Sequence, residues 1–232
     1  MKRSPRRCVG GSSGRRPQYP RRRDGDAAGP GLDRRGPGRH GGCGLGDPPP
    51  RPAPVVTGSP PGTDTYDLRA GPDLHPALLP LLPLVGVWAG EGQVGYPTIE
   101  GQHYRQRVSF GHDGRPFLAY ESRTVLLGPD GDVLRQSARE VGWWRAGEGE
   151  EFEVLLAHPT GIVEVYVGAA TGPASWELST DVVARTRSAK EVTANHRLYG
   201  VVDGALLYAV DMAAVGQPLQ PHLSARLERV AG

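Results

Sequence analysis

Hydrophobic and polar residues alternate along much of the chain with a period of two. In residues 162–168, IVEVYVG, the valines share one face, and Glu164 and Tyr166 share the opposite face. Residues 117–127 and 192–200 repeat this pattern. Successive side chains of a β-strand point to opposite faces, so the period predicts strands in all three segments.

Turn-forming sequences separate the strand-like segments at short intervals. They occupy residues 112–116, 128–132, 146–150, 158–161, 170–173 and 202–204. Many short strands at this spacing are typical of all-β folds, and about ten are expected, enough to close an antiparallel β-barrel without free edges. Several strand faces mix apolar with small polar residues, which favours a barrel with a ligand cavity over a tightly filled sandwich.

Two segments precede the regular strands. Residues 75–86, HPALLPLLPLVG, predict a short helix or two turns bounded by prolines. The segment GVWAGEG follows, and its tryptophan and three glycines share one face of a strand: Gly86, Trp88, Gly90 and Gly92. Glycine inside a strand marks a bend, a bulge or a close approach. The segment is interpreted either as a barrel corner filled by one indole or as a place where a ligand or another backbone comes near.

Composition divides the chain after residue 66. Residues 1–66 hold 14 Gly, 12 Pro and only two Leu, with 13 Lys and Arg against 5 Asp. So few large apolar side chains cannot form a core, and we expect a disordered Arg-, Gly- and Pro-rich tail there. Residues 67–232 form the predicted barrel domain and carry 14 basic and 20 acidic residues. The tail has neither a helical period nor a recognised binding module, so no nucleic-acid partner is expected.

Both cysteines, Cys8 and Cys43, lie in the tail, so the domain has no disulfide and no thiol nucleophile. This usage fits a reducing compartment, and the cytoplasm is the expected location. Prolines interrupt the apolar run at residues 74–90, and no membrane span is expected. Serine-hydrolase, P-loop and dinucleotide-binding motifs are missing. The oligomeric state is left open, a homodimer being one option.

The seven histidines are the candidates for metal binding. We expect two in solvent (His40, His75), two in turns (His112, His158) and two in strands (His103, His196), with the ring of His158 bonded to backbone. His222 differs because Leu219 and Leu223 give it an apolar setting. No second ligand stands at zinc spacing, but one neutral imidazole can hold a haem iron, since the porphyrin supplies the other four ligands. A buried histidine bonded to backbone is the alternative.

Several of these segments, in order along residues 74–230, resemble the nitrobindins. The matching stretches are GVWAGEG followed by GYPTI (95–99), GRPFLAYESRT (114–124), AHPTGIVEVYVG (157–168), AKEVT (189–193) and MAAVGQPLQPHL (212–223). The resemblance implies a ten-stranded antiparallel barrel like that of the lipocalins and fatty-acid-binding proteins. It also implies one haem b per subunit, bound near the mouth of the barrel.

The same resemblance implies roles for individual residues. His222 matches the axial ligand of the haem iron and is therefore also the expected catalytic residue, while Thr98 and Lys190 match positions that line the haem site. The implied activity is isomerisation of peroxynitrite to nitrate by ferric haem, with nitric oxide binding as a second property. The chain departs from the family at residues 101–103, where an aromatic residue is usual, and at 137–138, Ser-Ala, where Leu-His is common.

Two other functions stay open at this point. A non-enzymatic carrier of a hydrophobic ligand would clamp a carboxylate with interior Arg and Tyr side chains, for which Arg123, Arg197 and Tyr199 are candidates. A haem-based nitric oxide sensor would instead use the basic tail to bind a partner.

Overall fold

The computed structural model describes residues 62–232. The predicted tail, residues 1–66, lies outside the described residues except for 62–66. One 3-10 helix, η1 (Pro76–Leu84), precedes ten strands. The strands are β1 (Gly86–Tyr96), β2 (Ile99–Gly111), β3 (Phe117–Leu127), β4 (Val133–Ala146), β5 (Glu151–His158), β6 (Ile162–Gly172), β7 (Ser175–Arg185), β8 (Val192–Val202), β9 (Ala205–Ala214) and β10 (Gln220–Ala231).

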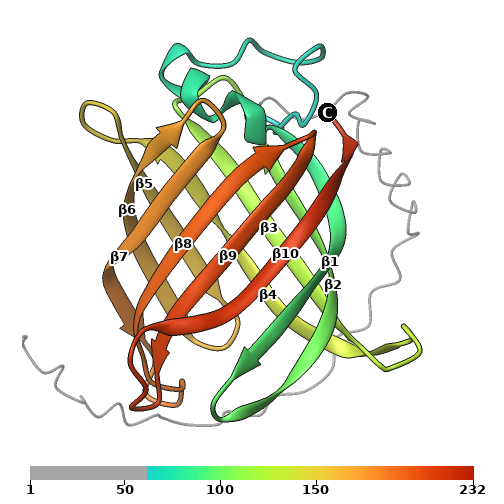
Figure 1. Ribbon diagram of the computed structural model, residues 1–232. Helices are drawn as coiled ribbons and strands as arrows, with labels where there is room; N and C mark the ends of the chain where they lie inside the picture. Colours follow the sequence, from blue (N-terminus) through green and yellow to red (C-terminus); the bar gives the residue numbers. More distant parts are fainter. Residues whose placement is uncertain (1–61) are drawn as a thin grey trace, which may run out of the picture. The chain divides into compact units, whose positions relative to one another are not determined.

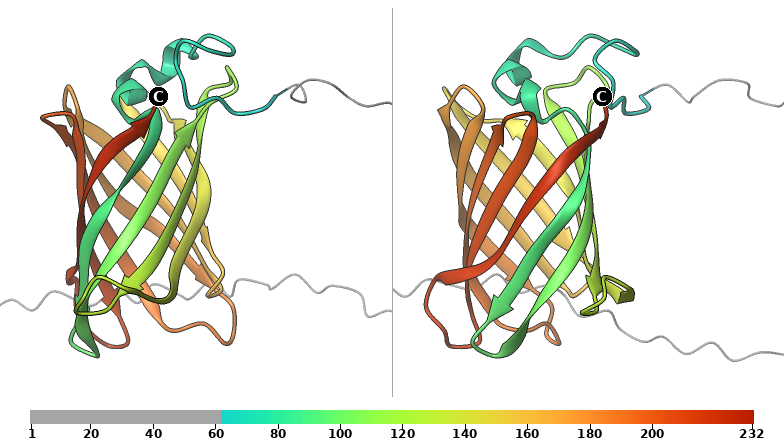
Figure 2. Two further views of the ribbon diagram at one scale, coloured as in Figure 1. Left: turned by 90° about the vertical axis from the view of Figure 1, so that its right-hand side faces the viewer. Right: turned by 45° about the vertical axis from the view of Figure 1, so that its right-hand side comes forward.

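The ten strands form one closed antiparallel barrel, as predicted. Each strand pairs with its neighbours in sequence, and β1 pairs with β10 to complete the ring (Figure 1, Figure 2). Closure pairs the edges that an open sheet would expose. No helix within residues 62–232 is long and apolar enough to cross a membrane.

Five of the six predicted turn sequences fall at junctions between consecutive strands and are confirmed. The sixth, residues 170–173, only reaches its junction, because β6 continues to Gly172. Three further connections were not among them: residues 97–98, 186–191 and 215–219. These join β1 to β2, β7 to β8 and β9 to β10. All three lie at the end of the barrel away from η1 (Figure 1).

Helix η1 closes one end of the barrel (Figure 2). Its three buried leucines, Leu78, Leu81 and Leu84, are fully inaccessible and join the main core. Two interior tryptophans bond to its carbonyls: Nε1 of Trp88 donates to Leu84 O at 2.8 Å, and Nε1 of Trp176 donates to Pro80 O at 3.1 Å. These bonds give both buried indole N–H groups an acceptor.

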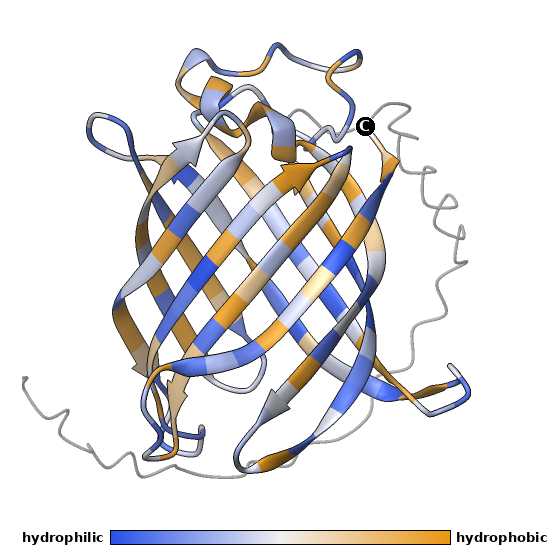
Figure 3. Cartoon of the chain, in the orientation of Figure 1, coloured by the Kyte–Doolittle hydropathy of each residue, from blue (hydrophilic) through white to orange (hydrophobic). Residues whose placement is uncertain are grey.

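The interior of the barrel is polar in places where the alternation suggests an apolar face. On β6, the inward side chains are Glu164 and Tyr166, whereas Val163 and Val167 are 46 % and 37 % exposed. Figure 3 shows the resulting mixture of hydrophilic and hydrophobic positions along each strand. Burying a carboxylate requires partners inside the barrel, and the cavity described below supplies them.

The glycines of β1 allow the first and last strands to approach closely. A Cβ on Gly90 would overlap the carbonyl oxygen of Arg226 and lie 2.9 Å from the Cα of Leu227, both on β10. A Cβ on Gly92 would lie 2.5 Å from the ring of Tyr104, which crosses the interior there. The glycines therefore serve close approach of backbone and ring, and Trp88 fills the core beneath η1.

Because the space at Gly90 is limited by backbone atoms, we expect Gly90→Ala to lower the free energy of unfolding by about 1–3 kcal/mol, the range for overpacked sites. Denaturant unfolding of the full chain measures this change. Gly101→Ala on β2 is the matched control, since its added Cβ meets nothing closer than 3.9 Å. Equal stability of the two variants would contradict the close-approach role.

Candidate functional site

A cavity of about 490 Å³ opens at the end of the barrel away from η1. Apolar side chains form much of its outer part, among them Val94, Ile99, Leu126, Val192 and Met212. Its inner part is polar and contains the side chains of Gln106, Ser122, Glu140, Glu164, Asn195 and Arg197. The volume lies within the range of small-molecule and cofactor sites, which are concave, mostly apolar and carry a few placed polar groups.

His222 lines this cavity and is held by one backbone hydrogen bond. Its Nδ1 lies 3.0 Å from the carbonyl oxygen of Gly95, on the neighbouring strand β1. A carbonyl only accepts, so the bond places the ring proton on Nδ1 and leaves a lone pair on Nε2. No hydrogen bond to Nε2 comes from any side chain or backbone group of residues 62–232.

Two irregularities in strand pairing place His222 in the cavity. The register of β10 against β9 shifts between Pro221 and Leu223, so His222 is an extra, unpaired residue. Because of this bulge, His222 and Leu223 both line the cavity, although neighbours in a regular strand face opposite sides. The register of β1 against β2 shifts between Val94 and Tyr96, at Gly95. The side chain of His222 and the carbonyl of Gly95 thus meet where the β1–β10 ladder ends.

Tyr96 fixes the imidazole from a second side. The rings of Tyr96 and His222 pack edge to face, with centroids 5.5 Å apart and planes at 84°. The Tyr96 hydroxyl donates to Met212 O at 3.1 Å and accepts from the N–H of Ala214 at 2.9 Å. The tyrosine therefore connects β1 to the end of β9 and restricts rotation of the histidine ring.

The environment keeps His222 neutral. Burial lowers its pKa below the ordinary value, Arg197 adds to this effect, and the bond to Gly95 opposes it without reversing the direction. A neutral imidazole with a fixed Nδ1–H and a free Nε2 is a metal-ligand arrangement, in which a backbone carbonyl orients the ring. No group of three or more His, Cys, Asp or Glu side chains in residues 62–232 is placed to hold a bare metal ion. The donor set therefore fits a cofactor that brings its own ligands.

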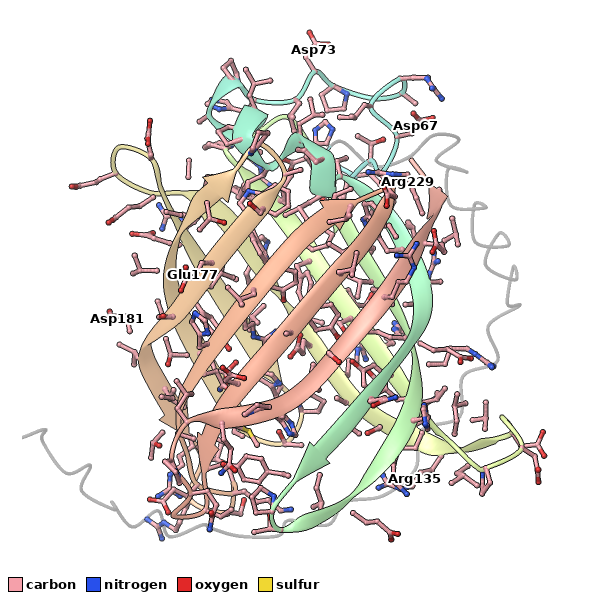
Figure 4. All side chains as sticks on the ribbon, viewed as in Figure 1. Asp67, Asp73, Arg135, Glu177, Asp181 and Arg229 are labelled. Atoms are coloured by element: carbon pink, nitrogen blue, oxygen red, sulfur yellow. The ribbon has the colours of Figure 1, made fainter. Side chains whose placement is uncertain are left out.

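The other two candidate residues differ in their position. Lys190, in the connection from β7 to β8, is exposed at the mouth and lines the cavity. Thr98 lies in the β1–β2 turn, where it is exposed, and it is not among the residues that line the cavity, although its neighbour Ile99 is. A second cation, Arg135 on β4, also lines the mouth; it lies at the end of the barrel opposite Arg229 and η1 (Figure 4).

A buried ion-pair network forms the polar inner wall. All five N–H groups of Arg197 are directed to oxygen atoms: two pair with Glu140 at 2.8 and 3.2 Å, one approaches Glu164 at 3.4 Å, and the others reach Tyr166 and Tyr199. Asn195 donates to the other oxygen of Glu164 at 2.5 Å. Burial opposes ionisation of Glu140, but Arg197 outweighs it and lowers the pKa of that carboxyl to about 2. Burial likewise opposes ionisation of Glu164, but His158 and Arg197 outweigh it and lower the pKa of Glu164. Both carboxyl groups are therefore ionised at neutral pH.

His158 belongs to this network, and the expectation that its ring bonds to backbone is wrong. Its Nε2 lies 3.1 Å from Glu164, and its side chain is 16 % exposed on the cavity wall. His112 is also more enclosed than a turn position suggests, at 1 % exposure. His196, in contrast, is a strand residue as expected, and it pairs with Glu177 on the outside at 2.7 Å. His40 lies outside the described residues.

Comparison with known proteins agrees with this geometry. Residues 77–229 match the family described as the THAP4-like, heme-binding beta-barrel domain. The chain belongs to this family, the nitrobindins. A relative named peroxynitrite isomerase from Salinispora arenicola is 56 % identical over 74 % of this chain and 90 % of its own length.

Two further proteins extend the comparison. A protein named ferric nitrobindin-like protein, from Saccharopolyspora erythraea, is 50 % identical over 73 % of this chain and 81 % of its own length. The crystal structure of Rv2717c from M. tuberculosis aligns with a TM-score of 0.61 and 43 % identity, covering 68 % of this chain and 99 % of that one. The barrel is thus shared with an experimentally determined structure.

The sequence did not point to several residues of this candidate site. Gly95 and Tyr96 lie in the matched GYPTI stretch, but their bonds depend on strands β9 and β10, over a hundred residues away. Glu140 and Glu164 carried no signal beyond their place in alternating segments. Glu164 lies on the strand face opposite the valines, and Glu140 stands just before the Gly-Trp-Trp end of its strand. Neither pattern says which face of the strand is inside the barrel.

Because Arg197 neutralises two buried carboxylates, we expect Arg197→Met to lower the free energy of unfolding by about 3–5 kcal/mol, as is typical when one partner of a buried pair is removed. Arg226→Met is the matched control, since its partner Glu228 is exposed and such pairs contribute about 0–1 kcal/mol. Urea unfolding of both full-length variants measures the difference. A loss below about 1 kcal/mol for Arg197→Met would contradict the assigned role.

Proposed function

We propose that this protein binds haem b through His222 and isomerises peroxynitrite to nitrate, with nitric oxide as a second ligand. The observation that carries the proposal is the bond from Nδ1 of His222 to the Gly95 carbonyl, which leaves Nε2 free in a cavity of cofactor size. Relatives named peroxynitrite isomerase at 56 %, 54 % and 52 % identity support the reaction.

The residues of the site suit haem in three respects. The neutral imidazole would supply one nitrogen ligand to the iron, and one protein ligand is sufficient because the porphyrin supplies four. The apolar outer wall suits the faces of the macrocycle, and the exposed cations Lys190 and Arg135 at the mouth suit its carboxylates. In this proposal Thr98 contributes from the turn at the rim, next to the lining residue Ile99.

The chain contributes orientation and electrostatics to the reaction. When bound, ferric haem supplies a Lewis-acidic iron with one open position for the substrate. Gly95 and Tyr96 hold the imidazole of His222 in one orientation. Lys190 and Arg135 give the mouth positive charge, which attracts an anion to the cavity. Helix η1 and its leucines close the opposite end of the barrel.

The carrier alternative receives no support from the arginines it requires. Every N–H of Arg197 is already bonded to a carboxylate or a tyrosine, Tyr199 among them. Arg123 is 61 % exposed and pairs with Glu121 outside the cavity. A fatty-acid carboxylate would therefore have to displace an internal carboxylate. The sensor alternative depends on the tail, most of which lies outside the described residues.

The proposal places this chemistry in the cytoplasm, on the ground that the predicted domain contains no cysteine. It assigns one haem to each chain, because His222 lines a cavity within a single barrel. The boundary at residues 66 and 67 between tail and domain is part of the same proposal.

Titration of the full chain with ferric haem, followed by Soret absorbance, tests the proposal. We expect saturation at one haem per chain, and His222→Ala should weaken binding by at least about 100-fold, beyond the 10–100-fold typical for losing a partner of a metal ligand. His196→Ala, an outer-surface histidine, is the control and should bind like the wild type. Equal binding by all three proteins would refute ligation by His222. Haem uptake without decay of peroxynitrite to nitrate would refute only the activity.

Lys190 provides a separate test of haem contacts at the mouth. Because Lys190 is exposed, we expect Lys190→Met to weaken haem binding by only about two- to fivefold, and the difference to shrink as salt is added. Lys190→Arg should retain wild-type affinity. Identical affinities of Lys190→Met and wild type at low salt would remove Lys190 from the site.

A further inference from the structure

His158 and His222 lie on opposite walls of the barrel, both near its mouth. In the closed order of strands, β5 and β10 are five strands apart in both directions, so they form opposite walls. His158 ends β5, and His222 lies near the start of β10, which places both at the end away from η1. Both side chains line the same cavity. A ligand held by one wall is therefore faced by the other.

One ring nitrogen of His158 is engaged and the other remains available. Nε2 lies 3.1 Å from Oε2 of Glu164, within hydrogen-bond distance. Nδ1 lies 3.9 Å from Oε1 of Glu140, beyond hydrogen-bond distance, and makes no hydrogen bond to residues 62–232. Glu164 is itself fixed by Asn195 and Tyr166, so the imidazole is positioned by a rigid carboxylate.

The charges around His158 favour its protonated form. The groups that face it are Glu164 and Tyr166 from β6, Glu140 from β4, and Arg197 from β8. Two carboxylates and one guanidinium leave one negative charge, which an imidazolium neutralises. Burial opposes that charge, but the bond to Glu164 and the charges of Glu140 and Glu164 outweigh burial and Arg197 and raise the pKa of His158 above its usual value.

The other cationic side chains that line the cavity are less suited to face a ligand there. Arg197 directs all its N–H groups to the network. Lys190 and Arg135 lie exposed at the mouth. Ser137 and Ala138, which also line the cavity on β4, bear short uncharged side chains. His158 is thus the partly buried, positively charged hydrogen-bond donor on the wall opposite His222.

We propose that His158 binds the anionic substrate, donating a hydrogen bond from Nδ1 to one of its oxygen atoms on the side of the cavity opposite His222. This inference rests on the proposed haem function. The hydrogen bond holds the anion while the reaction proceeds. The proton stays on His158, and the atoms of peroxynitrite and nitrate balance without it.

Azide binding to the ferric haem-loaded full chain, titrated optically from pH 5.5 to 8.5, tests this role with an inert anion. At pH 6 we expect His158→Leu to bind azide about tenfold more weakly than the wild type, as for loss of a hydrogen bond to a charged group. His158→Gln keeps a donor without the charge and should retain part of the affinity. The wild-type advantage over both variants should shrink as the pH rises through the pKa of His158.

His196→Gln is the matched control, because His196 also pairs with a carboxylate, that of Glu177. Glu177 lies on the outside of the barrel, where Figure 4 labels it. The control variant should behave like the wild type. A wild-type azide affinity in His158→Leu and His158→Gln at every pH, with haem affinity unchanged, would overturn the inference alone. Failure of the wild type to take up haem would instead overturn the proposed function, and this inference with it.

A measurement without haem provides a second check. NMR titration of the imidazole of His158 in the haem-free full chain should give a pKa above the ordinary 6.5. Glu164→Gln should lower that value, because it removes a charged partner of Nε2. A His158 pKa at or below 6.5 in the wild type would overturn the charged-donor role even if the variants fail to fold.

Discussion

Strands β1 and β10 close the barrel by pairing at short range, and the position of the candidate site follows from that contact. These strands are the first and last of the barrel, and their approach requires Gly90 to have no side chain. The ladder between them continues to the pair Val94 and Leu223 and stops there. At its end, a side chain–backbone bond between His222 and Gly95 replaces ladder bonding. The same closure therefore completes the sheet and positions the ring that the cavity presents.

Local patterns predicted the fold well because strand period and turn chemistry act over a few residues. They could not predict which face of β6 or β8 is inside. On β8, Asn195, Arg197 and Tyr199 face inward while Leu198 is 46 % exposed. A buried arginine is stable only opposite Glu140 and Glu164, which come from two other strands. That requirement appears only when the three strands are placed together.

The site itself was predicted unevenly for a related reason. The family resemblance pointed to His222 and Lys190, both of which line the cavity. Simple alternation would have directed His222 away from the side of Leu223, and the bulge that reverses this is a property of the pairing with β9. His158 was misjudged because its neighbour Pro159 indicates a turn, whereas its partner Glu164 lies across the β5–β6 hairpin. Pairing between strands thus decides the chemistry of residues whose local context is ordinary.

Helix η1 closes one end of the barrel and so limits how water and small ions exchange between its interior and the solvent. Leu78, Leu81 and Leu84 of η1 are inaccessible to solvent, and the carbonyls of Leu84 and Pro80 are bonded to buried indoles. In the part of the chain described, the polar chamber around Arg197 therefore exchanges with solvent through the mouth beside His222. A cofactor bound at that mouth would block this opening. Water and small ions in the chamber would then exchange with solvent only around the edges of the cofactor or after it dissociates. They would therefore have to enter the chamber before the cofactor binds.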